Sequence, residues 1–293
     1  MIDAALVDSY LGRLGVEREP PSVDGLRRLH RAHVERVPYE TVWLHLGEAW
    51  DIDPARAVER IALHDRGGYC FHVNGAFTEL LRALGYRTTK HVGGVHGPDG
   101  PSAEAMANHF VVVVHDLPDD DHPEGTWYVD AGLGDALHEP LPLCPAQHRQ
   151  DPLTFVLERQ AAGAPVGTGE WHFVHDRQHG SFTGMSFRAD PATTSAFVDK
   201  HRWLSTSPES GFVRTLTVQR RDATGADILR GCVLRRVGSD TAEVVLDQRA
   251  EWFDALADVF GLRLNGVTTD ARDPLWRRVS SMHEAWLARP DSS

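Results

Sequence analysis

The first 85 residues carry apolar positions at the spacing of amphipathic helices. In residues 21–37 the positions at helical spacing are Leu26, Leu29, His33 and Val37. The clearest helix is predicted after Asp53, a natural N-cap, because Pro54 fits the first helical position and one apolar stripe follows: Ala57, Val58, Ile61 and Ala62. The pattern returns after residue 70 and continues to Gly85. We therefore predict a helical bundle over residues 1–85.

Beyond residue 85 the pattern changes to short runs of valine and aromatic residues separated by glycine, proline and acidic turns. These strand signals occur at 109–116, 126–132, 153–160, 171–176 and 180–188. The last part mixes strand patterns at 212–221, 228–237 and 242–247 with helical patterns at 249–262 and 273–290. The chain is therefore predicted to be an α+β protein whose parts pack as one body.

Composition narrows the possible partners and location. The chain has 293 residues, a formal net charge of -12, 41% hydrophobic and 25% charged residues. These are ordinary globular values, and the negative charge disfavours nucleic acid, whose binding depends largely on lysine and arginine. No run approaches the roughly 20 apolar residues of a membrane span, so we expect no membrane association and a cytoplasmic location. The three cysteines form no CxxC pair, which suits a reducing compartment, and no complete metal-ligand set is evident, so no metal is expected.

The segment RGGYCFHVNG, residues 66–75, places Cys70 between two glycines and a predicted helix. A thiol at a helix start faces unpaired N–H groups and the positive end of the helix dipole, which both favour the thiolate. Gly67 and Gly68 allow a sharp bend and a close approach of substrate to the backbone, where the Cys70 N–H can bind an oxyanion. The alternative is that Cys70 is only a small buried residue.

A nucleophilic cysteine needs a base, and two predicted strands offer His109 and Asp130. If the strands pair so that His109 lies opposite Asp130, Val112 faces Trp127 and the carboxylate can orient the imidazole toward Cys70. A Cys–His–Asp triad results. The alternative is an ordinary hairpin whose polar ends happen to match, in a chain with 17 histidines.

These motifs together resemble the arylamine N-acetyltransferase family, whose signature is Arg-Gly-Gly-aromatic-Cys followed by a His strand and a Val-Asp-x-Gly strand. Two further segments match the family's pattern, HVERVPYET at 33–41 and STSPESGF at 205–212. The resemblance covers nearly the whole chain. It implies a helical domain at 1–85, a β-barrel at 86–195 and an α/β lid at 196–293, around a papain- or transglutaminase-like triad core.

The resemblance also implies a reaction. Cys70 would attack the thioester of acetyl-CoA, the acyl-donor cosubstrate, with His109 as base and Asp130 holding the imidazole. The acetyl-enzyme would then pass its acetyl group to an aromatic amine, an arylhydroxylamine or a hydrazine. Family members that are amide synthases use the same triad on a polyketide chain bound to an acyl carrier protein, and this alternative stays open. Hydrolysis or crosslinking by a papain- or transglutaminase-like enzyme and a non-catalytic binding role are further alternatives.

The sequence departs from the family pattern at several positions. His72 stands where glutamate is usual, so the charge of Arg66 must be satisfied elsewhere, and His72 itself is expected to be a solvated helix residue. Thr41 replaces asparagine, and an aliphatic residue replaces the usual phenylalanine after Val-Asp-x-Gly. The residues expected to form the acceptor wall are Tyr39, Phe71, Val95 and Leu133. The residues expected to flank the thioester arm of the coenzyme are Gly132 and Gly134.

Overall fold

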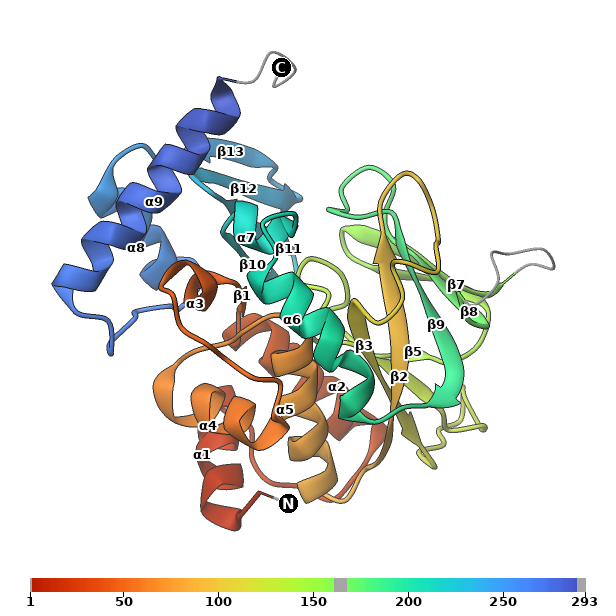
Figure 1. The fold of residues 1–293 in the computed structure, drawn as a ribbon. Coiled ribbons are helices and arrows are strands. Elements are labelled where there is room, and N and C mark those ends of the chain that lie inside the picture. The colour runs from red at the N-terminus through yellow and green to blue at the C-terminus, as the bar shows by residue number, and fades with distance from the viewer. Residues whose placement is uncertain (1, 161–167, 289–293) are drawn as a thin grey trace.

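The computed structural model describes residues 2–160 and 168–288, and its first third is helical (Figure 1). The helices are α1 (Ala4–Leu14), α2 (Val23–Arg36), α3 (Val42–His45), α4 (Pro54–His64) and α5 (Cys70–Ala83). Side chains cap three of them, because Asp3, Ser22 and Asp53 each accept a hydrogen bond from a backbone N–H of the first turn. The predicted start of α4, with Asp53 as cap and Pro54 in the first turn, is confirmed.

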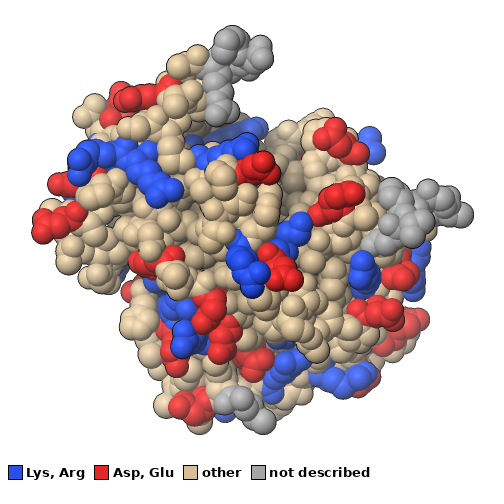
Figure 2. Space-filling model, viewed as in Figure 1, with Lys and Arg blue, Asp and Glu red and all other residues tan. Residues whose placement is uncertain are grey.

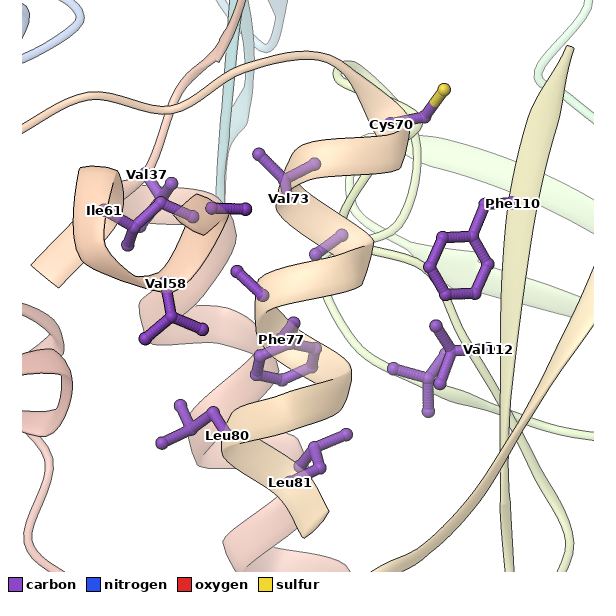
Figure 3. Packing of buried hydrophobic residues seen from close by; sticks show 14 of the residues in the cluster. Val37, Val58, Ile61, Cys70, Val73, Phe77, Leu80, Leu81, Phe110 and Val112 are labelled. Atoms are coloured by element: carbon purple, nitrogen blue, oxygen red, sulfur yellow. The ribbon is translucent and has the colours of Figure 1, made fainter. Parts of the chain in front are cut away.

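Helix α5 lies at the centre of the molecule. Every residue from Cys70 to Thr78 is buried, which is typical of a helix enclosed on all sides. One side packs against the other helices, including Val58 of α4, and the opposite side faces Phe110 and Val112 of β3 (Figure 3). The helix that begins with the cysteine is thus held between the helical layer and the large sheet.

The large sheet contains the strands β2 (Arg87–His96), β3 (His109–His115), β4 (Trp127–Val129), β5 (Leu141–Pro142), β6 (Ala146–Gln150), β7 (Leu153–Arg159), β8 (Trp171–Val174) and β9 (Gly184–Pro191). Their order is β5-β4-β3-β2-β9-β8-β7-β6, and neighbours run antiparallel in a barrel-like arrangement (Figure 1). The strand patterns predicted at β3, β4, β7, β8 and β9 are confirmed, whereas β2, β5 and β6 were not predicted.

The register between β3 and β4 corrects a prediction. Val112 lies opposite Val129, not Trp127, and His109 lies opposite Gly93 of β2. The predicted pairing of His109 with Asp130 was therefore wrong by two positions. Because side chains alternate between the two faces of a strand, a shift of two residues leaves both side chains on the same face. Their diagonal relation still permits contact.

A second sheet has the order β1-β10-β11-β12-β13, with β1 (Tyr39–Glu40), β10 (Thr217–Asp222), β11 (Gly225–Arg230), β12 (Val233–Gly238) and β13 (Ala242–Val245). The 3₁₀ helix η1 (Thr194–Phe197) and the helices α6 (Val198–Thr206) and α7 (Gly211–Arg214) precede β10, and α8 (Arg249–Asp258) and α9 (Thr269–Leu287) end the described chain. Strand β1 comes from the helical part of the sequence. It also bridges Gly68 just ahead of α5, so it ties the second sheet to the cysteine loop.

Across residues 2–160 and 168–288, none of the helices combines the length and the apolar character that crossing a membrane requires.

Candidate active site

Cys70 is the first residue of α5, directly behind a backbone bend at two glycines. A Cβ atom on Gly67 would lie 1.8 Å from the carbonyl oxygen of Pro38, and Gly68 has a φ of +127° and packs against His72. These contacts explain both glycines by packing within the chain. Tyr69, the N-cap residue, makes no side-chain capping bond, so the first N–H groups of α5 lack a side-chain acceptor.

His109 and Asp130 form a buried pair at the facing ends of β3 and β4. His109 Nε2 donates to Asp130 Oδ2 at 2.7 Å, and both side chains are almost fully buried. Burial lowers the pKa of His109, but the charge and hydrogen bond of Asp130, together with Cys70, outweigh it and raise that pKa to about 10. The imidazole is therefore held in its protonated form at neutral pH.

Four groups donate hydrogen bonds to the Asp130 carboxylate. Oδ1 accepts from Asn74 Nδ2 at 2.8 Å and from the Gly132 N–H at 3.0 Å. Oδ2 accepts from the Tyr128 hydroxyl at 2.9 Å, in addition to His109. These bonds hold the carboxylate in place, so that its bond to Nε2 fixes the tautomer and orientation of the imidazole.

The Cys70 side chain completes the cluster. A hydrogen bond and a charge interaction with Cys70 both contribute to the raised pKa of His109. Since Nε2 of the imidazole is bonded to Asp130, Nδ1 is the nitrogen left to face the sulfur. Cys70 Sγ also lies 3.6 Å from the carbonyl oxygen of Asn108. The structure thus brings together the three residues that the sequence predicted as a triad.

Arg66 finds its acidic partners outside α5. Its guanidinium bonds Glu40 Oε1 at 3.0 Å and lies 3.5 Å from Glu48, and Glu40 is fully buried. The second oxygen of Glu40 accepts the Val42 N–H at 2.7 Å. The charge of Arg66 is therefore satisfied from β1, and this pair fixes the loop that leads into Cys70.

The expectation that His72 is solvated was wrong. His72 is fully buried among the rings of Trp43, Trp50, Tyr69 and His201, and its Nε2 lies 3.1 Å from the carbonyl oxygen of Asp51. Burial, with the charges of nearby basic groups, lowers the pKa of His72 well below its ordinary value. His72 is thus a neutral core residue whose Nε2–H donates to a backbone carbonyl.

The residues expected at the acceptor wall lie in different surroundings. Phe71 is buried and contacts the rings of Tyr69 and Phe197. Leu133 is buried in the core of the large sheet, and the partly exposed Val95 packs against that core. Tyr39 is mostly buried, with a part of its surface exposed. Its burial, and to a smaller extent the charge of Cys70, raises its pKa well above the ordinary value. Tyr39 is therefore close enough to the sulfur to interact with it electrostatically.

The two glycines expected near the coenzyme both face protein atoms. A Cβ atom on Gly132 would lie 2.9 Å from Cys70 Cα, and one on Gly134, whose φ is +66°, would lie 1.9 Å from Gln219 Oε1. The loop that follows Asp130 is thus pressed against the start of α5 at one end and against β10 at the other.

A cavity of about 560 Å³ is lined mainly by residues of the C-terminal third of the chain. Ser181, one of its lining residues, donates hydrogen bonds from its N–H and Oγ to Asp135 at 2.8 and 2.9 Å, and it is 3.4 Å from Gln219 Nε2. Its lining contains three arginines, Arg214, Arg230 and Arg235, and one carboxylate, Glu243, which lies opposite Arg235 in the β12–β13 ladder. Arginines therefore outnumber carboxylates in the lining.

Sequence reasoning missed the supporting residues of this site. Asn74 was not predicted as a site residue, yet its Nδ2 donates to Asp130 and its Oδ1 accepts the Ala131 N–H at 2.9 Å. Asn108 directly precedes His109 and Tyr128 lies two residues before Asp130, and this closeness in the sequence was the available signal. Among residues 2–160 and 168–288, no group of three or more His, Cys, Asp or Glu side chains is placed to hold a metal ion.

Comparison with known proteins places this geometry in a family. The family model described as N-acetyltransferase matches residues 22–269. Arylamine N-acetyltransferase 2 of Mesocricetus auratus is 24% identical over 88% of this chain and 94% of its own length. The arylamine N-acetyltransferase of Mycolicibacterium smegmatis is 27% identical over 88% of this chain and 92% of its own.

Solved structures agree over the whole fold. The arylamine N-acetyltransferase of Nocardia farcinica has a TM-score of 0.79 and 26% identity, with 95% of each chain covered. That of Mycobacterium marinum, in complex with CoA, has a TM-score of 0.80 and 24% identity, with 94% of this chain and 99% of the other covered. The chain therefore belongs to the N-acetyltransferase family that includes the arylamine N-acetyltransferases, and it is an acyltransferase.

Proposed function

We propose that this enzyme transfers an acetyl group from acetyl-CoA to an aromatic amine through an acetyl-Cys70 intermediate. The observation that carries the proposal is the buried contact of Cys70, His109 and Asp130 at the start of α5. Asp130 keeps His109 protonated, and the imidazolium in turn stabilises a Cys70 thiolate. Arylhydroxylamines and hydrazines are further acceptors of the same chemistry.

In the first half-reaction the Cys70 thiolate attacks the thioester carbonyl. The Cys70 N–H, at the uncapped start of α5, is placed to stabilise the oxyanion. The carbon–sulfur bond to coenzyme A then breaks, and His109 gives its proton to the leaving thiolate. One thioester replaces another, so this step is nearly balanced in energy.

In the second half-reaction the amine nitrogen attacks the acetyl carbon on Cys70. His109, now neutral, accepts the proton that the nitrogen loses, and the bond between the acetyl carbon and sulfur breaks. The Cys70 thiolate and the His109 imidazolium are restored, so the cycle needs no other reactant. Asp130 stays ionised throughout and stabilises the imidazolium.

We propose the cavity next to the Gly132–Asp135 loop as the donor site. The loop contacts the start of α5 at Gly132 and, through Asp135, holds Ser181 in the cavity lining, so it connects the cavity to the nucleophile. The arginines in the cavity lining, Arg214, Arg230 and Arg235, can bind the phosphates of coenzyme A. Figure 2 shows Lys and Arg side chains gathered in the upper-left part of the face, where the C-terminal elements lie.

For the acceptor, we propose that Tyr39 and Val95 make direct contacts, because both are partly exposed near the triad. Phe71 and Leu133 are buried and support this wall from behind. A carrier-bound polyketide donor gains no support, because the relatives and solved structures described above are all named as arylamine N-acetyltransferases.

A rapid-mixing experiment tests the proposal. Mixed with acetyl-CoA and no amine, the reduced enzyme should release free coenzyme A in a burst of about one equivalent per active site. Cys70→Ala should give no burst. Steady release of coenzyme A only when an amine is present would contradict the acetyl-enzyme mechanism.

A further inference from the structure

The turn that leads into β3 directs a backbone carbonyl at the nucleophile. The carbonyl oxygen of Asn108 lies 3.6 Å from Cys70 Sγ. The preceding residue, Ala107, has a φ of +67°, a left-handed conformation that is unfavourable for alanine. Unfavourable backbone geometry beside a reactive group is maintained only where surrounding contacts enforce it.

The Asn108 side chain supplies those contacts. Its Oδ1 accepts the Val95 N–H at 2.8 Å, and its Nδ2 donates to the Val95 carbonyl oxygen at 2.9 Å. The β2–β3 ladder ends at the pair of Gly93 and His109. Beyond that point the amide of Asn108 takes the place of a strand partner for Val95. The carbonyl of Asn108 is thereby fixed relative to both β2 and His109.

This carbonyl accepts no hydrogen bond from Cys70 in the proposed cycle. Its oxygen lies 3.6 Å from Cys70 Sγ, and neither the thiolate nor the acetylated cysteine has a proton to donate to it. An acceptor oxygen is therefore left beside the acetyl carbon. A partly desolvated carbonyl without a donor is unfavourable, so an incoming N–H gains from pairing with it.

We propose that the Asn108 carbonyl accepts one N–H of the acceptor amine and thereby positions its nitrogen for attack on acetyl-Cys70. The inference rests on the proposed function. A primary amine has two N–H groups, so one can bond Asn108 while the other faces His109, which receives the proton. The nitrogen lone pair then points at the acetyl carbon. Asn108 acts as a positioning residue, and the site favours acceptors with an –NH₂ group.

A double perturbation tests this role. Pre-acetylated wild type and Asn108→Ala are each mixed with a primary arylamine or with its N-methyl derivative, and the rate of deacetylation of Cys70 is measured. Deacetylation by the N-methyl amine is slower in both proteins for steric reasons. In wild type the methyl group also replaces the N–H that bonds the Asn108 carbonyl. In Asn108→Ala that carbonyl is no longer held in place, so this second loss is absent. We expect the penalty for N-methylation to be about five- to tenfold larger in wild type than in Asn108→Ala.

Asn265→Ala, at an exposed asparagine, is the matched control, and its rates with both amines should stay within about twofold of wild type. If Asn108→Ala does not fold, Asn108→Ser, which can keep at most one bond to Val95, serves in the same comparison. Equal N-methylation penalties in wild type and variant would overturn the proposal. Failure of wild type to release coenzyme A in a burst would instead refute the acetyl-enzyme mechanism and this inference with it.

Discussion

Replacing Asp130 by asparagine removes a buried charge without changing the size of the side chain. The carboxylate accepts two hydrogen bonds at each oxygen, from Asn74 and Gly132 at one and from His109 and Tyr128 at the other. An amide has only one accepting oxygen, so two of these donors lose their acceptor. Hydrogen bonds to charged groups are worth roughly 1.5–3 kcal/mol each, so we expect urea unfolding to show a loss of about 3 kcal/mol or more.

The same substitution should remove the imidazolium. The pKa of His109 is raised to about 10 because Asp130 and Cys70 outweigh burial, which alone lowers it. Without the carboxylate, burial dominates and His109 is neutral at pH 7, so Cys70 loses its cationic partner. Because the thiolate is the form that reacts, we expect Asp130→Asn to slow alkylation of Cys70 by iodoacetamide at pH 7 by about tenfold or more.

Tyr128→Phe is the matched control, because it removes one hydrogen bond to Asp130 but no charge. Its alkylation rate should stay within about threefold of wild type. The reasoning fails if folded Asp130→Asn is alkylated at the wild-type rate between pH 6 and 9. In that case the ionisation of Cys70 would not depend on the pair of His109 and Asp130.

Three further outcomes are expected. The folded-state pKa of His109 lies above its ordinary value of 6.5, so the stability from its protonation is full below about pH 6.5 and is lost as the pH rises through about 10. Unfolding in urea should therefore show this loss in wild type and not in His109→Gln. Glu40→Gln leaves the buried Arg66 with only the partly exposed Glu48 as an acidic partner and should lower the free energy of unfolding by about 3 kcal/mol. Arg56→Ala, which breaks an exposed ion pair, should lower it by less than about 1 kcal/mol. Equal effects would contradict a structural role for the buried pair. Arg230→Ala combined with Arg235→Ala should raise KM for acetyl-CoA at least tenfold. The rate of Cys70 acetylation by p-nitrophenyl acetate, which has no phosphates, should stay within about twofold of wild type. Equal losses with both donors would refute the phosphate assignment.

The sequence was most informative where local chemistry decides the structure. The start of α4 follows from the cap at Asp53 and the proline after it, and both effects act within one turn. The strand pattern of β3 was equally clear, because five consecutive apolar residues after His109 are buried on both faces of the sheet. The same local patterns predicted that Cys70 lies at a helix start and that His109 and Asp130 lie on two neighbouring strands.

Tertiary contacts decided what the sequence left open. Strand β2 contains Gly93 and Gly94, which favour a turn, but the structure needs them because Val111 and Met106 approach too closely for a Cβ atom. The register of β3 on β4 depends on the connection between them, in which His122 folds back to bond Thr126. No pattern along the chain specifies that connection.

Charges paired across long sequence separations were also beyond local reasoning. The partner of Arg66 is Glu40, 26 residues earlier, and the strand that carries Glu40 belongs to the C-terminal sheet. His72 is buried because α3 and α6 bring Trp43 and His201 against it. A single sequence gives the residue types of such clusters but not their assembly.

Mass spectrometry of the enzyme after brief exposure to acetyl-CoA, followed by peptide mapping, tests the central claim most directly. One acetyl group should be found on Cys70, and none on Cys232, which is buried and whose pKa is raised to about 11 by that burial. Partly exposed Cys144 is the second internal control. The account is contradicted if wild type carries no acetyl group, or if Cys70→Ala is acetylated to the same extent at another residue.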